Sequence, residues 1–139
     1  IENIVAMKEA SGNMEQIMEV IRLRANEFGV LSGDDALTMP LIAAGADGVI
    51  SVVGNAFPKE FGQMVNHALN GEMAEARSLH YKLIEIIHLL FVEGNPAGIK
   101  EVLSQLDICE NYLRLPLVSV TDNTSDRIRK VLIEEGFLN

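Results

Sequence analysis

The first 70 residues of the chain alternate three times between a short apolar run and a segment whose apolar residues have helical spacing. Strands are predicted at 4–7, 28–31 and 49–53, and helices at 14–26, 35–45 and 58–69. Strands separated by helices pair in parallel, because each helix returns the chain to the same end of the sheet. The sequence therefore predicts an α/β fold with a small parallel sheet.

Residues 71–139 predict helices without further strands. Helices are expected at 72–92, 95–106 and 124–135, and an extended stretch at 113–120. The segment Thr124-Ser125-Asp126 has the residue types that cap helices, and Gly136 is a typical stop. We therefore expect two regions, with βα units over residues 1–70 and a helical domain over residues 71–139.

Three parallel strands form a stable sheet only when helices cover both faces or when the sheet closes into a barrel. Successive βα units whose helices pack on one side belong to a (β/α)8 barrel, which needs roughly 250 residues. This chain has 139 residues, begins with Ile1 rather than Met, and enters a strand-like run almost at once. We therefore expect a chain that was cut just before a strand and that carries about half of a barrel.

The composition is that of a globular protein, with 48% hydrophobic and 22% charged residues. Acidic residues outnumber basic ones by 20 to 11, so we expect no basic surface that could bind nucleic acid or an anionic membrane. The longest apolar run, 86–92, is interrupted by His88 and is too short to span a bilayer. The single cysteine, Cys109, cannot form an intrachain disulfide, which favours a reducing compartment such as the cytoplasm.

Lys8 follows the first apolar run, at the strand end that faces the active site in a βα barrel. In an apolar barrel mouth the ammonium group would lose solvation, and the pKa of the amine would fall. The neutral amine could then attack a carbonyl group and form a Schiff base. The alternative is a lysine that ends a strand and extends its ammonium group into water.

Other residues that could carry chemistry have simpler structural explanations. Gly33 would let the backbone approach a ligand closely, but it also fits a turn, and Asp34 fits a helix cap. Asp34 and Asp35 could form a carboxylate pair, although adjacent acids at a helix start usually interact with the helix dipole. His80 and His88 lie on one predicted helix without a partner at metal-ligand spacing. We therefore expect no metal site and no cofactor.

Five short segments form an ordered set of motifs. They are Lys8–Asn13 (KEASGN), Leu31–Asp35 (LSGDD), Gly48–Val52 (GVISV), Phe91–Pro96 (FVEGNP) and Leu113–Leu117 (LRLPL). In this order they resemble the C-terminal half of the dihydrodipicolinate synthase family, which is part of the N-acetylneuraminate lyase superfamily. The resemblance covers essentially all of the chain. Each segment alone is a weak signal, but five in the same order are a strong one.

The resemblance implies a pyruvate-dependent class I aldolase built on a (β/α)8 TIM barrel. Strands six to eight of that barrel would lie in this chain, followed by a helical C-terminal domain. The family's Schiff-base lysine falls on Lys8, its backbone glycine near the bound keto acid on Gly33, and its apolar residue beside the imine on Ile50. The implied substrates are pyruvate and aspartate 4-semialdehyde, on the route to diaminopimelate and lysine. The implied full-length enzyme is a cytoplasmic homotetramer that needs no cofactor.

The chain departs from the family pattern at two places. Ala6 replaces a glycine that is common two residues before the lysine, and Asn95-Pro96-Ala97-Gly98 replaces Asn-Pro-Ile-Pro. In the family, the proton-relay tyrosine and threonines, the carboxylate-binding arginine and the lysine-feedback site belong to the N-terminal half, and no residues here match them. We therefore expect no full turnover by these 139 residues alone.

Two other functions stay open from the sequence. One is another pyruvate-dependent aldolase, such as N-acetylneuraminate lyase or a 2-keto-3-deoxy acid aldolase, because the residues that select the second substrate belong to the other half. The other is a catalytically inactive half-barrel fragment, whose unpaired strand edges and apolar inner face would seek a partner.

Overall fold

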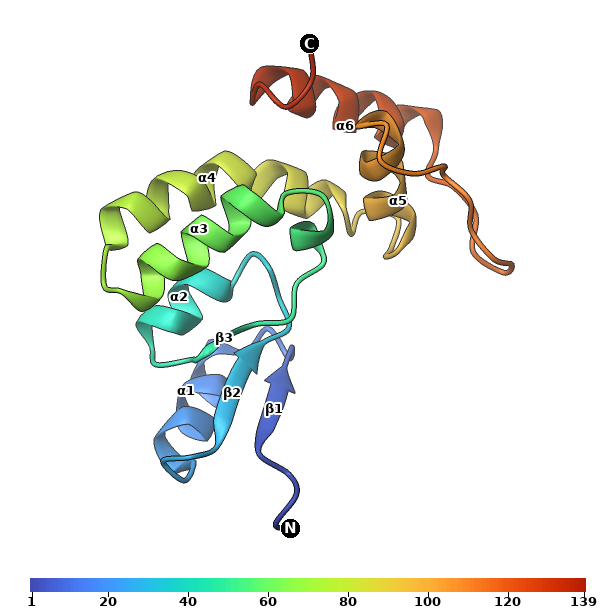
Figure 1. The fold of residues 1–139 in the computed structure, drawn as a ribbon. Coiled ribbons are helices and arrows are strands. Elements are labelled where there is room, and N and C mark those ends of the chain that lie inside the picture. The colour runs from blue at the N-terminus through green and yellow to red at the C-terminus, as the bar shows by residue number, and fades with distance from the viewer.

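The computed structural model describes residues 1–139 and contains three βα units followed by further helices (Figure 1). The strands are β1 (Ala6–Glu9), β2 (Gly29–Ser32) and β3 (Gly48–Val49). The helices are α1 (Met14–Leu23), α2 (Thr38–Ala43), α3 (Pro58–Leu69), α4 (Met73–Leu89), α5 (Ala97–Gln105) and α6 (Asp122–Glu134), with a 3-10 helix, η1 (Val53–Asn55). The strands lie at one end of the molecule, and α5 and α6 lie at the other. No helix combines the length and the apolar character needed to cross a membrane.

The three strands form one parallel sheet in the order β1-β2-β3. Lys8 of β1 pairs with Leu31 of β2, which pairs in turn with Gly48 of β3. Ala6, at the position where the family pattern has a glycine, pairs with Gly29. A Cβ atom added to Gly29 would stand 3.2 Å from the Cβ of Ala6, so the glycine on the neighbouring strand makes room for the alanine.

The two faces of the sheet have different surroundings, since alternate residues of a strand point to opposite faces. Glu9 and Val30 are buried on the face that the helices cover. Lys8 is exposed on the other face, and Ile50, two residues after the Gly48 that shares its row, is 49% exposed. Helices therefore cover one face only, and the face that bears Lys8 is open.

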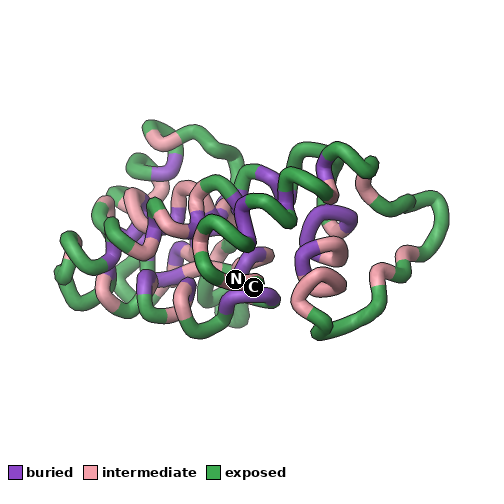
Figure 2. The backbone as a smooth tube through the Cα atoms, turned by 90° about the horizontal axis from the view of Figure 1, so that it is seen from above, coloured by how far each residue is buried: buried purple, intermediate pink, exposed green.

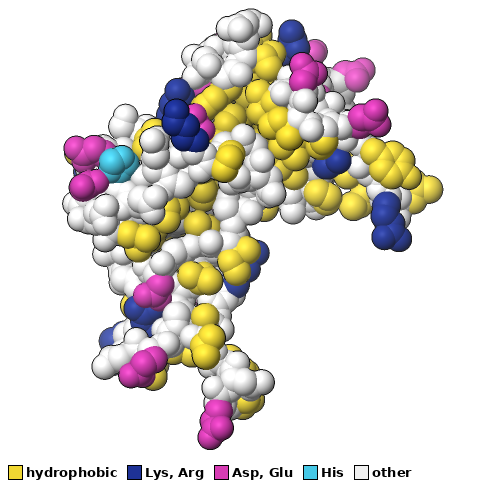
Figure 3. Space-filling view, in the orientation of Figure 1, with side chains coloured by type: hydrophobic (Ala, Val, Ile, Leu, Met, Phe, Trp, Pro, Cys, Tyr) yellow, Lys and Arg dark blue, Asp and Glu magenta, His cyan; other side chains and the backbone are white.

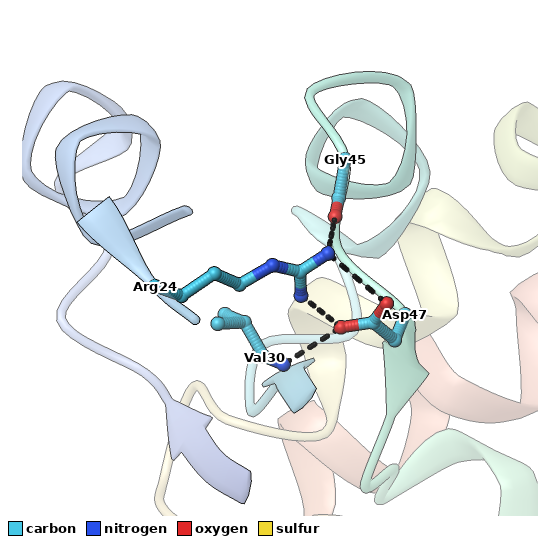
Figure 4. Close-up of polar contacts among 4 residues, drawn as sticks. All are labelled: Arg24, Val30, Gly45 and Asp47. Carbon is cyan, nitrogen blue, oxygen red and sulfur yellow. Dashed lines mark hydrogen bonds and ion pairs between the residues drawn. The ribbon is translucent and has the colours of Figure 1, made fainter. Parts of the chain in front are cut away.

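Arg24, just after α1, connects the first two βα units (Figure 4). Its guanidinium group donates to the carbonyl oxygen of Gly45 at 3.1 Å and to both carboxylate oxygens of Asp47. The same carboxylate accepts a 2.8 Å hydrogen bond from the N–H of Val30. The bonds from Arg24, and after them the one from Val30, lower the pKa of Asp47. A charged network thus fixes the turn before β3 against β2.

The largest core lies between η1 and helices α3 to α6. It contains residues from both sides of position 70, including Phe61 and Met64 of α3 and Leu83 of α4. Gly98 lets α5 begin directly against the end of α4, because a Cβ atom there would overlap the backbone of Leu90. The second half of the chain is therefore packed onto the last βα unit.

Residues 107–120 form a protruding loop between α5 and α6 (Figures 2 and 3). Its exposed apolar side chains are Ile108, Tyr112, Leu115, Leu117 and Val118. Glu101 holds the base of the loop, since its carboxylate accepts 2.6 Å hydrogen bonds from the Asn111 Nδ2 and the Ser125 hydroxyl. The loop is thus anchored at its ends and exposed along its length.

The strands differ from the prediction in their boundaries. The first strand is Ala6–Glu9 rather than 4–7, because these are the residues that have partners in β2. The third strand has two residues rather than the predicted 49–53, because the chain turns into η1 after Ile50. As predicted, no strand follows residue 70, and the stretch 113–120 pairs with no other segment of the sheet.

The helix at 58–69 is confirmed at both ends, and the other predicted helices are confirmed with shorter or shifted ranges. The segment 35–45 shortens to α2 (Thr38–Ala43), because a turn built by Asp34 comes first. The last helix begins at Asp122, before the cap predicted at 124–126. There the carboxylate of Glu93 accepts hydrogen bonds from the N–H and the hydroxyl of Thr121, and these bonds lower the pKa of Glu93.

Candidate active site

Lys8, Gly33 and Ile50 lie at the carboxyl ends of the three adjacent strands. Lys8 is the third of the four residues of β1. Gly33 directly follows β2, and its N–H donates to the carbonyl oxygen of Glu9 at 2.7 Å. Ile50 directly follows β3, and its N–H donates to the carbonyl oxygen of Ser32 at 2.9 Å. The parallel order therefore brings the three residues to one edge of the sheet.

The side chain of Lys8 lies against the backbone of Gly33. A Cβ atom at Gly33 would stand 2.7 Å from the Cε of Lys8 and 3.1 Å from its Cγ. It would also stand 2.7 Å from the Cβ of Ala10. The two 2.7 Å distances are shorter than real Cβ contacts, so a side chain at residue 33 would have to displace Ala10 and the flexible end of Lys8.

The apolar mouth expected around Lys8 is not formed by these residues. Lys8 is exposed, and Ile50 on the same face is about half-exposed. The physical reason is that helices cover only the opposite face of a three-stranded sheet. An enclosed lysine would need further strands to fold over the open face.

The turn that follows Lys8 is fixed by two polar side chains. The buried carboxylate of Glu9 accepts hydrogen bonds of 3.2 and 3.3 Å from the N–H of Ser11. Asn13 caps α1, because its side chain accepts a 3.2 Å bond from the N–H of Gln16. The sequence did not single out Glu9, since its burial depends on helices that pack later in the chain.

Asp34 lies in the turn before α2 and is not the helix cap that the sequence predicted, because the N-cap is Leu37 and no side chain caps this helix. Its Oδ1 accepts hydrogen bonds from the N–H of Ala36 at 2.9 Å and of Leu37 at 3.2 Å. These bonds build the turn that precedes α2, where backbone N–H groups have no partner within the helix. Asp34 therefore acts as a turn residue.

Asp35 does not have the helix-dipole role that was expected of it. Its side chain is buried, and its Oδ2 accepts hydrogen bonds from the N–H of Val52 at 3.0 Å and of Val53 at 2.8 Å. The Oδ1 of the same carboxylate is buried without a hydrogen-bond partner. Asp35 therefore connects the loop that carries Gly33 to the loop that follows Ile50.

A cleft of about 690 Å³ adjoins Gly33 at the strand ends. The turns after β1 and β2 and the C-terminal end of α4 line it, through Ala10, Gly12, Gly33, Asp34, Ala36, Leu37, Ile87, His88, Phe91 and Val92. Asp34 and His88 are the only ionisable side chains in this lining. The sequence did not predict a contribution from α4, because no local signal shows which turn of a distant helix reaches the strand ends.

The two histidines of α4 have different surroundings. His80 is buried, and its Nδ1 has no hydrogen-bond partner. Burial lowers the pKa of His80, and the nearby charge of His88 lowers it further. His88 is exposed. No group of three or more His, Cys, Asp or Glu side chains comes together in the way a metal ion requires.

Comparison with known proteins shows close relatives along nearly the whole chain. The model of the dihydrodipicolinate synthetase family matches residues 1–135. The 4-hydroxy-tetrahydrodipicolinate synthase of Azobacteroides pseudotrichonymphae is 55% identical over 132 residues, which are 95% of this chain and 45% of that protein. The enzyme of the same name from Phocaeicola vulgatus is 50% identical over 133 residues, 96% of this chain and 45% of that protein.

Solved structures have the same fold over the same length. Dihydrodipicolinate synthase from Aquifex aeolicus matches with a TM-score of 0.93 and 41% identity, covering 97% of this chain and 46% of that one. The enzyme from Thermotoga maritima matches with a TM-score of 0.95 and 39% identity, covering 99% of this chain and 48% of that one. The chain thus spans a little under half the length of these relatives. Sequence motifs, fold and relatives agree that the chain belongs to the dihydrodipicolinate synthetase family.

Proposed function

We propose that this chain carries the Schiff-base lysine of a 4-hydroxy-tetrahydrodipicolinate synthase, with Lys8 forming an imine with pyruvate. The observation that carries the proposal is the contact between the Lys8 side chain and the backbone of Gly33. Because residue 33 has no side chain, the Lys8 side chain can lie across the strand ends, where its amine would attack a small keto acid. Ile50, on the same edge of the sheet, would present an apolar surface to the imine.

The proposed reaction begins when the neutral amine of Lys8 attacks the ketone carbon of pyruvate and water leaves. The resulting iminium accepts electrons as a methyl proton leaves, which gives an enamine. The enamine carbon then attacks the aldehyde carbon of aspartate 4-semialdehyde, and the aldehyde oxygen takes a proton. Hydrolysis of the new imine, or displacement of Lys8 by the amine of the product, frees the lysine.

The same proposal assigns β1, β2 and β3 to strands six to eight of a TIM barrel. Residues 1–70 would then be its last three βα units, and residues 71–139 the helical C-terminal domain. The one-sided cover of the sheet supports this assignment, because the uncovered face of each strand would line the interior of a barrel. The proposed full-length enzyme is a cytoplasmic homotetramer whose other half supplies the proton relay and the carboxylate-binding arginine.

Reductive trapping tests the role of Lys8. The chain is incubated with pyruvate and borohydride, and the modified residue is located by mass spectrometry of peptides. We expect one reduced pyruvate adduct on Lys8, its loss in Lys8→Ala, and its retention in Lys59→Ala. Lys59 is an exposed lysine in the first turn of α3 and provides the matched control.

The outcomes separate the alternatives. A folded chain without an adduct at Lys8 would be an inactive half-barrel and would contradict the proposal. An adduct is common to all pyruvate-dependent aldolases of this kind. The aldehyde that reacts with the pyruvate adduct distinguishes these enzymes from one another. A chain completed with the other half of the barrel should consume aspartate 4-semialdehyde and not N-acetylmannosamine. Without that half we expect imine formation but no condensation.

A further inference from the structure

We propose that the buried hydroxyl groups of Ser32 and Thr38 position Lys8, because they fix the backbone against which its side chain lies. The proposal rests on the proposed function, since Lys8 is the lysine that would form the imine with pyruvate. Ser32 is the last residue of β2, and Thr38 is the first residue of α2. Both act through the backbone of Gly33 and Asp34, so they are positioning residues.

The side chain of Ser32 closes a short loop around Gly33. Its hydroxyl group donates a 2.8 Å hydrogen bond to the carbonyl oxygen of Asp34 and accepts a 3.1 Å bond from the N–H of the same residue. The N–H of Asp34 belongs to the peptide group that also contains the carbonyl of Gly33. Because a peptide group is planar and rigid, these bonds fix the orientation of the backbone directly after Gly33.

Thr38 brings a second hydroxyl group to the same carbonyl oxygen. Its Oγ1 donates a 2.8 Å hydrogen bond to the carbonyl oxygen of Asp34 and lies 3.2 Å from the Oγ of Ser32. A carbonyl oxygen has two lone pairs, so it can accept from both hydroxyl groups at once. Ser32 is 1% exposed and Thr38 is 0% exposed. Water therefore cannot replace a hydroxyl group that is removed, and the buried carbonyl oxygen would lose a partner.

These bonds matter for Lys8 because Gly33 is held on both sides. The N–H of Gly33 donates a 2.7 Å hydrogen bond to the carbonyl oxygen of Glu9, and the two hydroxyl groups hold the peptide group that follows. The exposed side chain of Lys8 has many rotamers, and its packing on Gly33 limits where the amine lies. A shift of the Gly33 backbone would therefore change the direction in which the amine meets pyruvate, while the amine stays accessible.

Thr38→Val tests the role of the hydroxyl group, because valine has nearly the shape of threonine but no donor. We expect the rate of pyruvate trapping on Lys8 with borohydride to fall about fivefold, as for a reacting group that is less well oriented. Thr38→Ser keeps the donor and should keep most of the parent rate. Acetylation of Lys8 by N-hydroxysuccinimidyl acetate needs no fixed orientation and should be equal in the parent and in Thr38→Val.

Thr124→Val is the matched control. Thr124 is also a buried threonine near the start of a helix, and its hydroxyl group bonds to Glu93, far from the strands (Figure 1). The control should lose stability as Thr38→Val does, but its rate of pyruvate trapping should equal that of the parent. An equal fall in both variants would show that trapping follows stability, and would overturn the proposal.

Hydrogen exchange tests the loop without relying on Thr38→Val. In the parent chain the amide of Asp34 should exchange about tenfold or more slowly than in an unstructured peptide. Ser32→Ala removes both bonds to Asp34, so it should speed this exchange and slow pyruvate trapping. An unprotected Asp34 amide in the folded parent would overturn the proposal.

The outcomes also separate this proposal from the proposed function. Trapping on Lys8 that is equally fast in the parent and in Thr38→Val would overturn the positioning role and leave imine formation intact. A parallel fall in trapping and acetylation would show a change in accessibility, which also overturns the positioning role. A folded parent chain without an adduct on Lys8 would instead contradict the Schiff-base function, and the positioning role with it.

Discussion

The buried carboxylate of Asp35 accepts a 2.8 Å hydrogen bond from the N–H of Val53, 18 residues further along the chain. With the bond from the N–H of Val52, it fixes the loop after Ile50 to the loop that carries Gly33. In Asp35→Ala both N–H groups lose their acceptor inside the protein. We expect a loss of about 1–3 kcal/mol in the free energy of unfolding, measured in urea.

Asp35→Asn is the matched control for that loss. The asparagine oxygen can accept both N–H bonds, while its amide nitrogen takes the place of the Oδ1 that has no partner. We therefore expect Asp35→Asn to lose less stability than Asp35→Ala. Equal losses in the two variants would show that the hydrogen bonds to Val52 and Val53 are not what Asp35 contributes.

Gly33→Ala is expected to displace the side chain of Lys8, because the new Cβ atom would stand 2.7 Å from the Cε of Lys8. The rate of pyruvate trapping on Lys8 should then fall by about tenfold or more, since misplacement of a reacting group by about 1 Å can cost 100-fold. Quantitative mass spectrometry of the reduced adduct measures the rate. An unchanged rate in a folded variant would contradict the proposed geometry.

Two glycines in helices should respond to alanine in opposite directions. A Cβ atom at Gly98 overlaps the backbone of Leu90, and we expect Gly98→Ala to lower stability by about 1–3 kcal/mol or more. Nothing lies within 4 Å of a Cβ atom at Gly62 in α3. Gly62→Ala should therefore raise stability by about 0.5–1 kcal/mol, through the higher helix propensity of alanine. Thermal unfolding of both variants at neutral pH checks the pair, and a shift of the same sign in both would refute the packing argument.

The loss of folding stability at low pH should depend in part on Asp47. Its pKa is lowered in the fold, so its contribution to stability is complete above the unfolded pKa of about 3.9 and is lost as pH falls through the folded value. The Asp47 side chain is 44% exposed, so solvent screening keeps this contribution below about 1 kcal/mol.

We expect Asp47→Asn to be less stable than the parent at pH 7 and to lose less stability between neutral pH and pH 3. Glu93 has a lowered pKa as well and will leave part of the acid sensitivity in place. Unfolding midpoints measured across this pH range at low and high salt check the prediction. A variant whose acid dependence is as steep as that of the parent would contradict it.

The sequence predicts the bounds of a helix or strand well when residues at its own ends determine where it begins and stops. The helix at 58–69 begins at Pro58, which suits a first turn, and ends at the Asn70-Gly71 break. The third strand could not be bounded in this way, because a strand ends where its partner ends. The carbonyl oxygen of Ser32 accepts the last ladder bond, from the N–H of Ile50, and the carboxylate of Asp35 then accepts from the N–H groups of Val52 and Val53.

In the candidate site too, local signals predicted some positions, while others depend on tertiary packing. Lys8 and Gly33 could be placed at neighbouring strand ends, because parallel pairing follows from the alternation of strands and helices. Asp35 was expected to interact with the helix dipole, and its link to the next loop requires knowledge of the packing between two βα units. His88 could be placed on a helix but not beside Gly33, since that depends on how α4 packs across the strand ends.

The open face of the sheet sets the lifetime of any imine formed at Lys8. Bulk water reaches this lysine from the same side as pyruvate, so hydrolysis of the imine competes at once with its reduction. The enamine that follows would exchange its carbon-bound hydrogens with solvent before any aldehyde arrives. In heavy water, turnover between pyruvate and its adduct should therefore appear as deuterium in the pyruvate methyl group, a signal that needs neither the second substrate nor a closed barrel.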